Sequence, residues 1–145
     1  GKQDQGFVPL WVAKHFLKKK LSYIGFGGNG FQIRDVIHIN DVCDLIFLQI
    51  KKLNKINNKT LNIGGGLKSF SSLRNLTNLC REETNNIIPI KSISKTSAFD
   101  IPIYVTDNSK TFRLYNWRPK RSMSQIVKDI YIWIKENKEV WKYFK

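Results

Sequence analysis

The sequence GFQIRDVIHINDV, residues 30–42, carries the strongest fold signal in the chain. Within it, FQIRDVIHI (residues 31–39) alternates apolar and polar side chains, which is the pattern of a half-buried β-strand. Asn40 then favours a helix start, because a short polar side chain can accept the free backbone N–H groups of a first helical turn. The stretch therefore predicts a strand that runs directly into a helix over residues 41–53.

Similar patterns on both sides of this stretch predict a mixed α/β fold. The expected order is helix, two strands, helix, strand, helix, strand and two helices, without internal repeats. Helices are expected at residues 5–20, 41–53, 71–83, 109–117 and from 122 on, and strands at residues 21–26, 31–39, 60–63 and 85–93, with an extended piece at 101–107. A chain of 145 residues is long enough for one domain with a real core, so we expect a single region, residues 1–145.

Apolar residues at helical spacing predict which helix faces are buried. The expected buried residues are Val8, Trp11, Val12, Phe16 and Leu17 in the first helix and Ile126, Ile130, Trp133 and Ile134 in the last. Cys43 and Cys80 also fall inside apolar helical patterns, so we expect two small core residues rather than a disulfide. Unpaired cysteines favour a reducing, cytoplasmic location.

The charge balance is strongly basic, with a net charge of +14. Such a charge suits a nucleic-acid-binding protein, but it equally suits a protein that attracts phosphorylated ligands. The lysines are scattered, and the sequence has no arginine-rich arm, zinc-ligand spacing or aromatic RNA-binding motif. We therefore expect mostly solvated surface charge and no nucleic-acid partner. No stretch has the roughly 20 apolar residues that a membrane span requires, so no membrane partner is expected either.

Two motifs match cofactor or catalytic signatures but lie in the wrong context. Gly25, Gly27 and Gly30 have GxGxxG spacing, yet a strand pattern follows them where a dinucleotide fingerprint requires a helix. Tyr131 and Lys135 have YxxxK spacing, but they lie on the last helix of the chain. We interpret the glycines as a turn and the Tyr–Lys pair as a surface feature, and we predict no catalytic residue, metal site or cofactor-binding residue within the chain.

Four segments in order resemble the extended short-chain dehydrogenase/reductase family, specifically its NAD-dependent nucleotide-sugar epimerases and dehydratases. They are DQGFV at residues 4–8, GNGFQIRDVIHINDV at 28–42, LNIGGG at 61–66 and YVTDNSKTFRLYNWRPKRSMSQIV at 104–127. DQGFV is similar to the DQGWV of CDP-paratose 2-epimerases. Four ordered segments with correct spacing are more specific than any one of them.

The resemblance implies the C-terminal, substrate-binding part of a Rossmann-type α/β fold. The N-terminal half of such enzymes supplies the NAD site and the catalytic Ser/Thr, Tyr and Lys, which nothing here matches. We therefore expect a fragment that is inactive alone, with NAD bound by the missing half. The expected ligand is a nucleotide-diphosphate sugar, a CDP-sugar being favoured, and the full-length enzyme is expected to be a homo-oligomer. A 4-epimerase, 4,6-dehydratase or reductase of the same family, or a non-catalytic basic nucleotide-binding module, remains as an alternative.

Arg34 is the leading candidate for ligand binding. An arginine fixed on a strand suits bidentate binding of a diphosphate, and the resemblance implies that this arginine contacts the diphosphate. The alternative is a surface arginine paired with Asp35 or Asp41. Gln32 is expected on the same strand face. Gly6, Phe7 and Val8 are expected to meet the nucleotide at a helix N-terminus, although Phe7 could equally be the first core residue of that helix.

One departure from the family pattern concerns a second cation. The resemblance leads us to expect an arginine three residues before Asp100, but Ser97 stands there. Lys95 is the expected substitute, as a point charge without the guanidinium fork. We expect structural rather than ligand-binding roles for five further residues: Asp35, His38, Asp41, Trp117 and Pro119. Residues 64–66 are expected to allow close approach of two chain segments.

Overall fold

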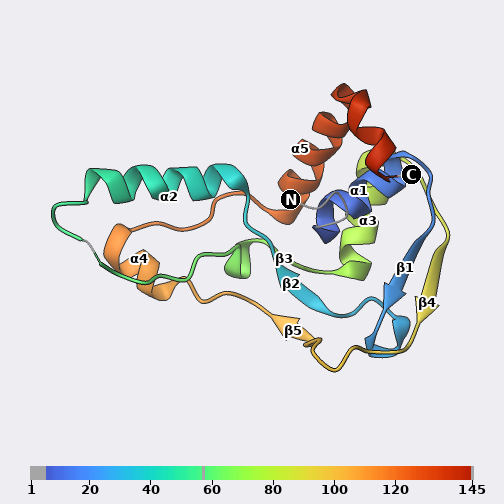
Figure 1. Cartoon of the computed structure of the whole chain (residues 1–145), viewed down its shortest axis with the longest axis horizontal. Helices are drawn as coiled ribbons and strands as arrows, with labels where there is room; N and C mark the ends of the chain where they lie inside the picture. Colours follow the sequence, from blue (N-terminus) through green and yellow to red (C-terminus); the bar gives the residue numbers. More distant parts are fainter. Residues whose placement is uncertain (1–5, 57, 145) are drawn as a thin grey trace. The chain divides into compact units, whose positions relative to one another are not determined.

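The computed structural model describes residues 6–56 and 58–144, and Figure 1 shows its elements. The helices and strands are α1 (Phe7–Phe16), β1 (Leu21–Ile24), β2 (Ile33–Asp35), α2 (Ile39–Lys51), β3 (Phe70–Ser72), α3 (Leu73–Thr84), β4 (Ile90–Ile93), β5 (Ile103–Tyr104), α4 (Ser109–Tyr115) and α5 (Met123–Glu136). Short 3₁₀ turns are η1 (Phe26–Gly28), η2 (Gly66–Lys68) and η3 (Lys138–Phe144). The predicted α/β class is confirmed.

The chain divides into two compact units. The first unit comprises residues 1–32, 71–102 and 124–145, and the second comprises residues 33–70 and 103–123. Each unit is therefore assembled from segments that are distant in sequence.

The first unit combines a two-stranded parallel sheet with helices. β1 and β4 run side by side in the same direction, with Leu21 opposite Ile90 (Figure 1). α1 packs on α3, where Trp11 Nε1 donates to Thr77 Oγ1 at 3.0 Å. Phe16 contacts Tyr131 and Trp141 edge to face, at ring-centroid distances of 5.7 and 5.2 Å. The buried apolar residues of this unit include Val8, Trp11, Val12, Ala13, Leu21, Leu76, Cys80, Ile88, Ile126, Val127 and Ile134.

The second unit is built around β2, which pairs with β5. β2 and β5 are parallel. The core of this unit consists of Leu45 from α2 together with Tyr115 and Trp117, and partly buried apolar residues pack against them. Burial of these large side chains joins α2 to the segment that follows α4.

The strand–helix prediction for residues 31–53 is confirmed in kind but not in its bounds. β2 has three residues, and α2 begins at Ile39 rather than at Asp41. The prediction that Asn40 caps this helix is wrong. The capping residue is His38, whose ring Nδ1 accepts the Asn40 backbone N–H at 3.1 Å. A ring nitrogen with a free lone pair can cap a helix in the same way as a short polar side chain.

Other bounds also shift. α1 ends at Phe16, because the chain turns at Lys18 with a φ of 55°. Residues 60–63, predicted as a strand, join no sheet among the described residues. Instead, side chains from α4 bind the carbonyls: Lys110 Nζ donates to Thr60 O at 2.9 Å, and Thr111 Oγ1 donates to Asn62 O at 2.8 Å.

Two of the residues predicted to be buried are exposed. Cys43 is exposed on α2, whereas Cys80 is buried as predicted. Trp133 is 52% exposed on α5, where Val127 is buried in addition to the predicted Ile126 and Ile134. An apolar stripe indicates that a helix has a buried face, but the neighbouring elements decide which edge of the stripe is covered.

Candidate functional site

β2 and β5 place two polar side chains next to each other. Arg34 on β2 is the register partner of Tyr104 on β5. Because register partners of paired strands project from the same sheet face, the guanidinium and the phenol belong to one surface. Arg34 is half-buried and its Nη1 donates to Ile33 O at 2.7 Å, while Tyr104 is 51% exposed. Tyr104 was not predicted from the sequence, where its one signal was its place at the start of the fourth family-like segment.

Short contacts around β2 fix the backbone that carries Arg34. The neighbouring Asp35 carboxylate accepts the Gly66 backbone N–H at 2.8 Å. A side chain at Gly64 would collide with Thr106, and one at Gly65 would collide with the Val36 carbonyl. The predicted close approach at residues 64–66 is therefore confirmed, as is the scaffold role of Asp35.

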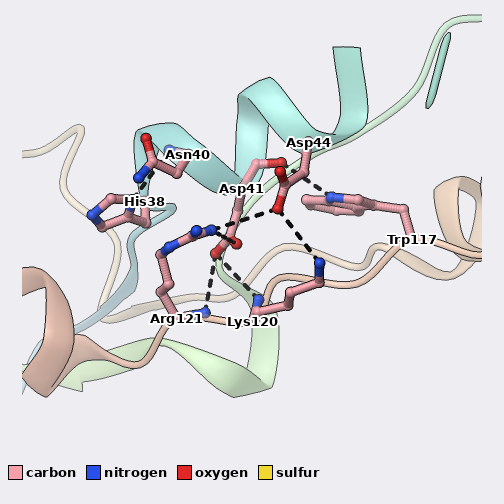
Figure 2. Close-up of polar contacts among 7 residues, drawn as sticks. All are labelled: His38, Asn40, Asp41, Asp44, Trp117, Lys120 and Arg121. Atoms are coloured by element: carbon pink, nitrogen blue, oxygen red, sulfur yellow. Dashed lines mark hydrogen bonds and ion pairs between the residues drawn. The ribbon is translucent and has the colours of Figure 1, made fainter. Parts of the chain in front are cut away.

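A buried carboxylate anchors the helix that follows β2 (Figure 2). The Asp41 side chain is fully buried and accepts the backbone N–H groups of Lys120 and Arg121 at 3.2 and 3.1 Å. It also forms an ion pair with the Arg121 guanidinium, and its backbone carbonyl accepts Trp117 Nε1 at 3.0 Å. Asp44 extends the cluster with contacts of 3.5 and 3.6 Å to the same two basic side chains. Asp41 thus has the predicted scaffold role.

Helix α1 begins at the predicted nucleotide-facing residues, all in the first unit. Gly6 precedes the helix with a φ of 106°, a conformation that favours glycine. Phe7 is half-buried, and Val8 is 2% exposed within the core. Because the Val8 side chain is occupied by packing, only its backbone is available to a ligand.

Gln32 and Lys95 lie at the same edge of the β1–β4 sheet. Gln32 Nε2 donates to Ile24 O at the end of β1, at 3.0 Å. Lys95 follows the end of β4, and carboxyl ends of parallel strands share one edge. Gln32 Oε1 is buried without a hydrogen-bond partner among the residues described. Asp100 closes a turn in which its N–H donates to Ser97 O at 3.1 Å.

The predicted residues are divided between the two units. Gly6, Phe7, Val8, Gln32, Lys95 and Asp100 lie in the first, and Arg34 lies in the second with Tyr104. Gln32 precedes β2, so the predicted shared strand with Arg34 is not formed.

The glycine motif does not form a cofactor loop. Gly25, Gly27 and Gly30 all have positive φ in the turn around η1, and β2 follows them. The turn interpretation is therefore confirmed. The motif does not suit dinucleotide binding, because the diphosphate would require a helix N-terminus directly after the glycines. On α5, Lys135 Nζ lies 5.9 Å from the centroid of the half-buried Tyr131 ring, which also packs against Phe16. Residues 6–56 and 58–144 contain no His, Cys, Asp or Glu cluster suited to a metal.

A basic cavity of about 760 Å³ lies within the second unit, beyond the end of β5. Its charged lining residues are Lys68, Asp107, Arg113 and Arg118. The Arg118 guanidinium lies 3.9 Å from the centroid of the Phe112 ring, in cation–π contact. None of the residues predicted to bind a ligand lines this cavity, although the predicted scaffold residues Gly65, Gly66 and Pro119 do.

Comparison with known proteins gives the same family as the sequence motifs. Residues 1–64 match the NAD dependent epimerase/dehydratase family. The chain is 31% identical to the CDP-paratose 2-epimerase of Salmonella typhi over 132 residues, covering 90% of this chain and 39% of that protein. It is 29% identical to the UDP-glucose 4-epimerase of Mycoplasma pneumoniae over 126 residues, covering 81% of this chain and 36% of that protein.

Solved structures give the same fold. The dTDP-glucose 4,6-dehydratase of Bacillus anthracis, determined in complex with NAD, matches with a TM-score of 0.77 at 22% identity, covering 97% of this chain and 42% of that one. The chain thus spans about two fifths of the length of the relatives it matches. Within the described part of the chain, no helix has the length and apolar character needed to cross a membrane.

Proposed function

We propose that this chain, which belongs to the NAD dependent epimerase/dehydratase family, is the sugar-nucleotide-binding part of a nucleotide-sugar epimerase of the CDP-paratose 2-epimerase type. The observation that carries the proposal is 31% identity over 90% of the chain to such an enzyme. In that reaction a sugar carbon is oxidised to a transient ketone and then reduced on the opposite face. Residues 1–145 act as one substrate-binding region in this proposal.

Arg34 is proposed to bind the diphosphate. Arg34 lies on a strand, and the Gly66 backbone N–H donates to the neighbouring Asp35 carboxylate. These contacts limit movement of the backbone that carries the guanidinium. A planar guanidinium can donate two parallel hydrogen bonds to a phosphoryl group. Tyr104, the register partner of Arg34, adds a phenol that can donate to the sugar or the phosphate.

The other predicted residues lie in the first unit and are proposed to contact the ligand there. Gly6, Phe7 and Val8 contribute mainly backbone groups at the start of α1. The unpartnered acceptor Gln32 Oε1 suits a ligand hydroxyl or amino group. Lys95 supplies a second positive charge, and Asp100 holds the loop around Ser97.

NAD supplies the hydride chemistry of the family. We propose that the cofactor site and the catalytic Tyr and Lys come from sequence outside residues 1–145. This chain then binds and orients the sugar nucleotide and does not epimerise it alone. The full-length enzyme is proposed to act in the cytoplasm as a homo-oligomer.

Calorimetric titration of the 145-residue chain with CDP, UDP, GDP and dTDP tests the proposal. We expect CDP to bind most tightly and Arg34→Gln to weaken binding about tenfold or more, because two charge-assisted hydrogen bonds are lost. Lys51→Gln removes a positive charge from an exposed position of α2 and should leave CDP affinity unchanged. A folded chain that binds none of the four nucleotides would contradict the proposal.

A UDP-sugar 4-epimerase is the second candidate, because two UDP-sugar 4-epimerases match at 29% and 30% identity. Tighter binding of UDP than of CDP would favour it. A preference for a single-stranded oligonucleotide over every nucleotide diphosphate would instead favour a non-catalytic nucleic-acid module.

A further inference from the structure

A second polar cavity lies entirely within the first unit. Its volume is about 420 Å³, and it is lined by Tyr23 and Asn29 from the β1–η1 region and by Arg74, Asn78 and Arg81 from α3, with Gly28 and Ile90. The Tyr23 phenol contacts Thr77 Oγ1 at 2.7 Å. The Tyr23 ring therefore lies on the side of β1 that faces α3. None of the residues proposed above to bind a sugar nucleotide lines this cavity.

The α3 residues of this cavity share one helix face. Arg74, Asn78 and Arg81 are spaced by four and three positions, which places them in a row along the helix. The Arg74 guanidinium lies 5.3 Å from the Phe31 ring centroid, a cation–π contact that restrains its position. Two guanidinium groups and one amide therefore line the same side of the cavity.

The two arginines are not neutralised locally. Among the described residues, neither forms an ion pair with a carboxylate, and Arg81 Nε is buried without a hydrogen-bond partner. A buried charged donor without an acceptor is costly, so an anionic acceptor at this place would stabilise the folded chain. α3 also lacks an acidic residue in its first turn, where Arg74 lies and where negative charge is favoured.

We propose that this cavity binds the phosphoryl group of a small phosphorylated metabolite, at a site separate from the sugar-nucleotide site. Arg74 and Arg81 hold the phosphoryl oxygens, and the Asn78 and Asn29 amides donate to the remaining oxygens. The Tyr23 ring forms the wall against which the organic part of the ligand packs. A cavity of about 420 Å³ accommodates a phosphomonoester of a few carbon atoms.

NMR titration of the ¹⁵N-labelled chain with inorganic phosphate and with glycerol 3-phosphate tests this site. Both ligands should shift the Nε–H signals of Arg81 and Arg74 and the Asn78 side-chain amide in a saturable manner. Glycerol, and chloride at equal ionic strength, should not. Arg81→Gln and Arg74→Gln should each weaken phosphate binding about tenfold, because each removes a charge-assisted contact.

Three further variants separate this site from the sugar-nucleotide site and from loss of folding. Arg34→Gln and the surface control Lys51→Gln should leave the phosphate response of Arg81 unchanged. Arg81→Lys keeps the charge but loses the fork, so intermediate affinity is expected. Equal phosphate affinity in the parent chain and in folded Arg81→Gln, or equal shifts with chloride, would overturn the proposal. Binding of a single-stranded oligonucleotide through Arg81, without a response to either phosphate ligand, would overturn it as well.

Discussion

Asp41 and Arg121 lie 80 residues apart in the sequence and meet in a charge-assisted hydrogen bond in the second unit. The carboxylate has no exposed surface, and the guanidinium side chain is 29% exposed. Since Asp41 also accepts two backbone N–H groups, one carboxylate joins the start of α2 to the segment that precedes α5. That connection holds the helix directly after β2, the strand that carries Arg34.

We predict that Asp41→Asn lowers the free energy of unfolding by about 3 kcal/mol. The substitution removes a buried negative charge that pairs with the Arg121 guanidinium and accepts two backbone N–H groups. Urea denaturation followed by circular dichroism measures the change. Asp44→Asn is the matched control: this carboxylate is half-exposed, so its loss should cost less than about 1 kcal/mol. Equal losses for the two variants would show that burial of Asp41 is not what makes the contact strong.

Tyr104→Ala should weaken nucleotide binding about tenfold or less while leaving the free energy of unfolding nearly unchanged, because a half-exposed side chain contributes little to the core. Calorimetry and urea denaturation of the same samples separate the two effects. Ile103→Ala, at the preceding position and on the opposite strand face, is the control and should leave affinity unchanged. An affinity loss confined to Ile103→Ala would place the ligand on the other face of β5.

Stability should fall as the pH drops below about 6.5, through His15. Burial lowers the pKa of His15, a nearby Arg81 lowers it further, and a hydrogen bond with the Trp11 carbonyl opposes the shift. At pH values above 6.5, His15 is neutral in both the folded and the unfolded chain, so its contribution is complete. Below that value the unfolded chain binds the proton first, and stability is lost until the folded-state pKa is reached.

Unfolding free energies measured between pH 7.5 and 5.5 test this behaviour. His15→Gln should flatten the profile. A slope that is unchanged in His15→Gln would assign the pH dependence to another group.

Thiol labelling should distinguish the two cysteines. Burial raises the pKa of Cys80 to about 12, so this thiol is neutral and inaccessible in the folded chain. Cys43 is exposed on α2 and should react with a thiol reagent at neutral pH. We expect one labelled thiol per folded chain and two after denaturation, with Cys43→Ser abolishing native labelling and Cys80→Ser leaving it intact. Rapid native labelling of Cys43→Ser would mean that α3 opens readily.

Local patterns in the sequence were sufficient for the α/β class, for most helices and for the rejection of the glycine motif as a cofactor loop. Alternation in residues 31–39 excludes a helix after Gly30, and this test needs no knowledge of distant residues. The family could likewise be inferred from ordered short segments, whereas ligand binding by Arg34 stays a prediction.

Only the tertiary structure placed Tyr104 beside Arg34 and Arg121 beside Asp41. Only it showed that Cys43 is exposed and that residues 60–63 have no strand partner in the described part of the chain. The physical reason is the range of the forces involved. Backbone preference and side-chain periodicity act over a few residues, so the sequence displays them directly. Strand register, burial of one particular helix edge and the partner of a buried charge depend on contacts between segments that are tens of residues apart, which form only when the chain has folded.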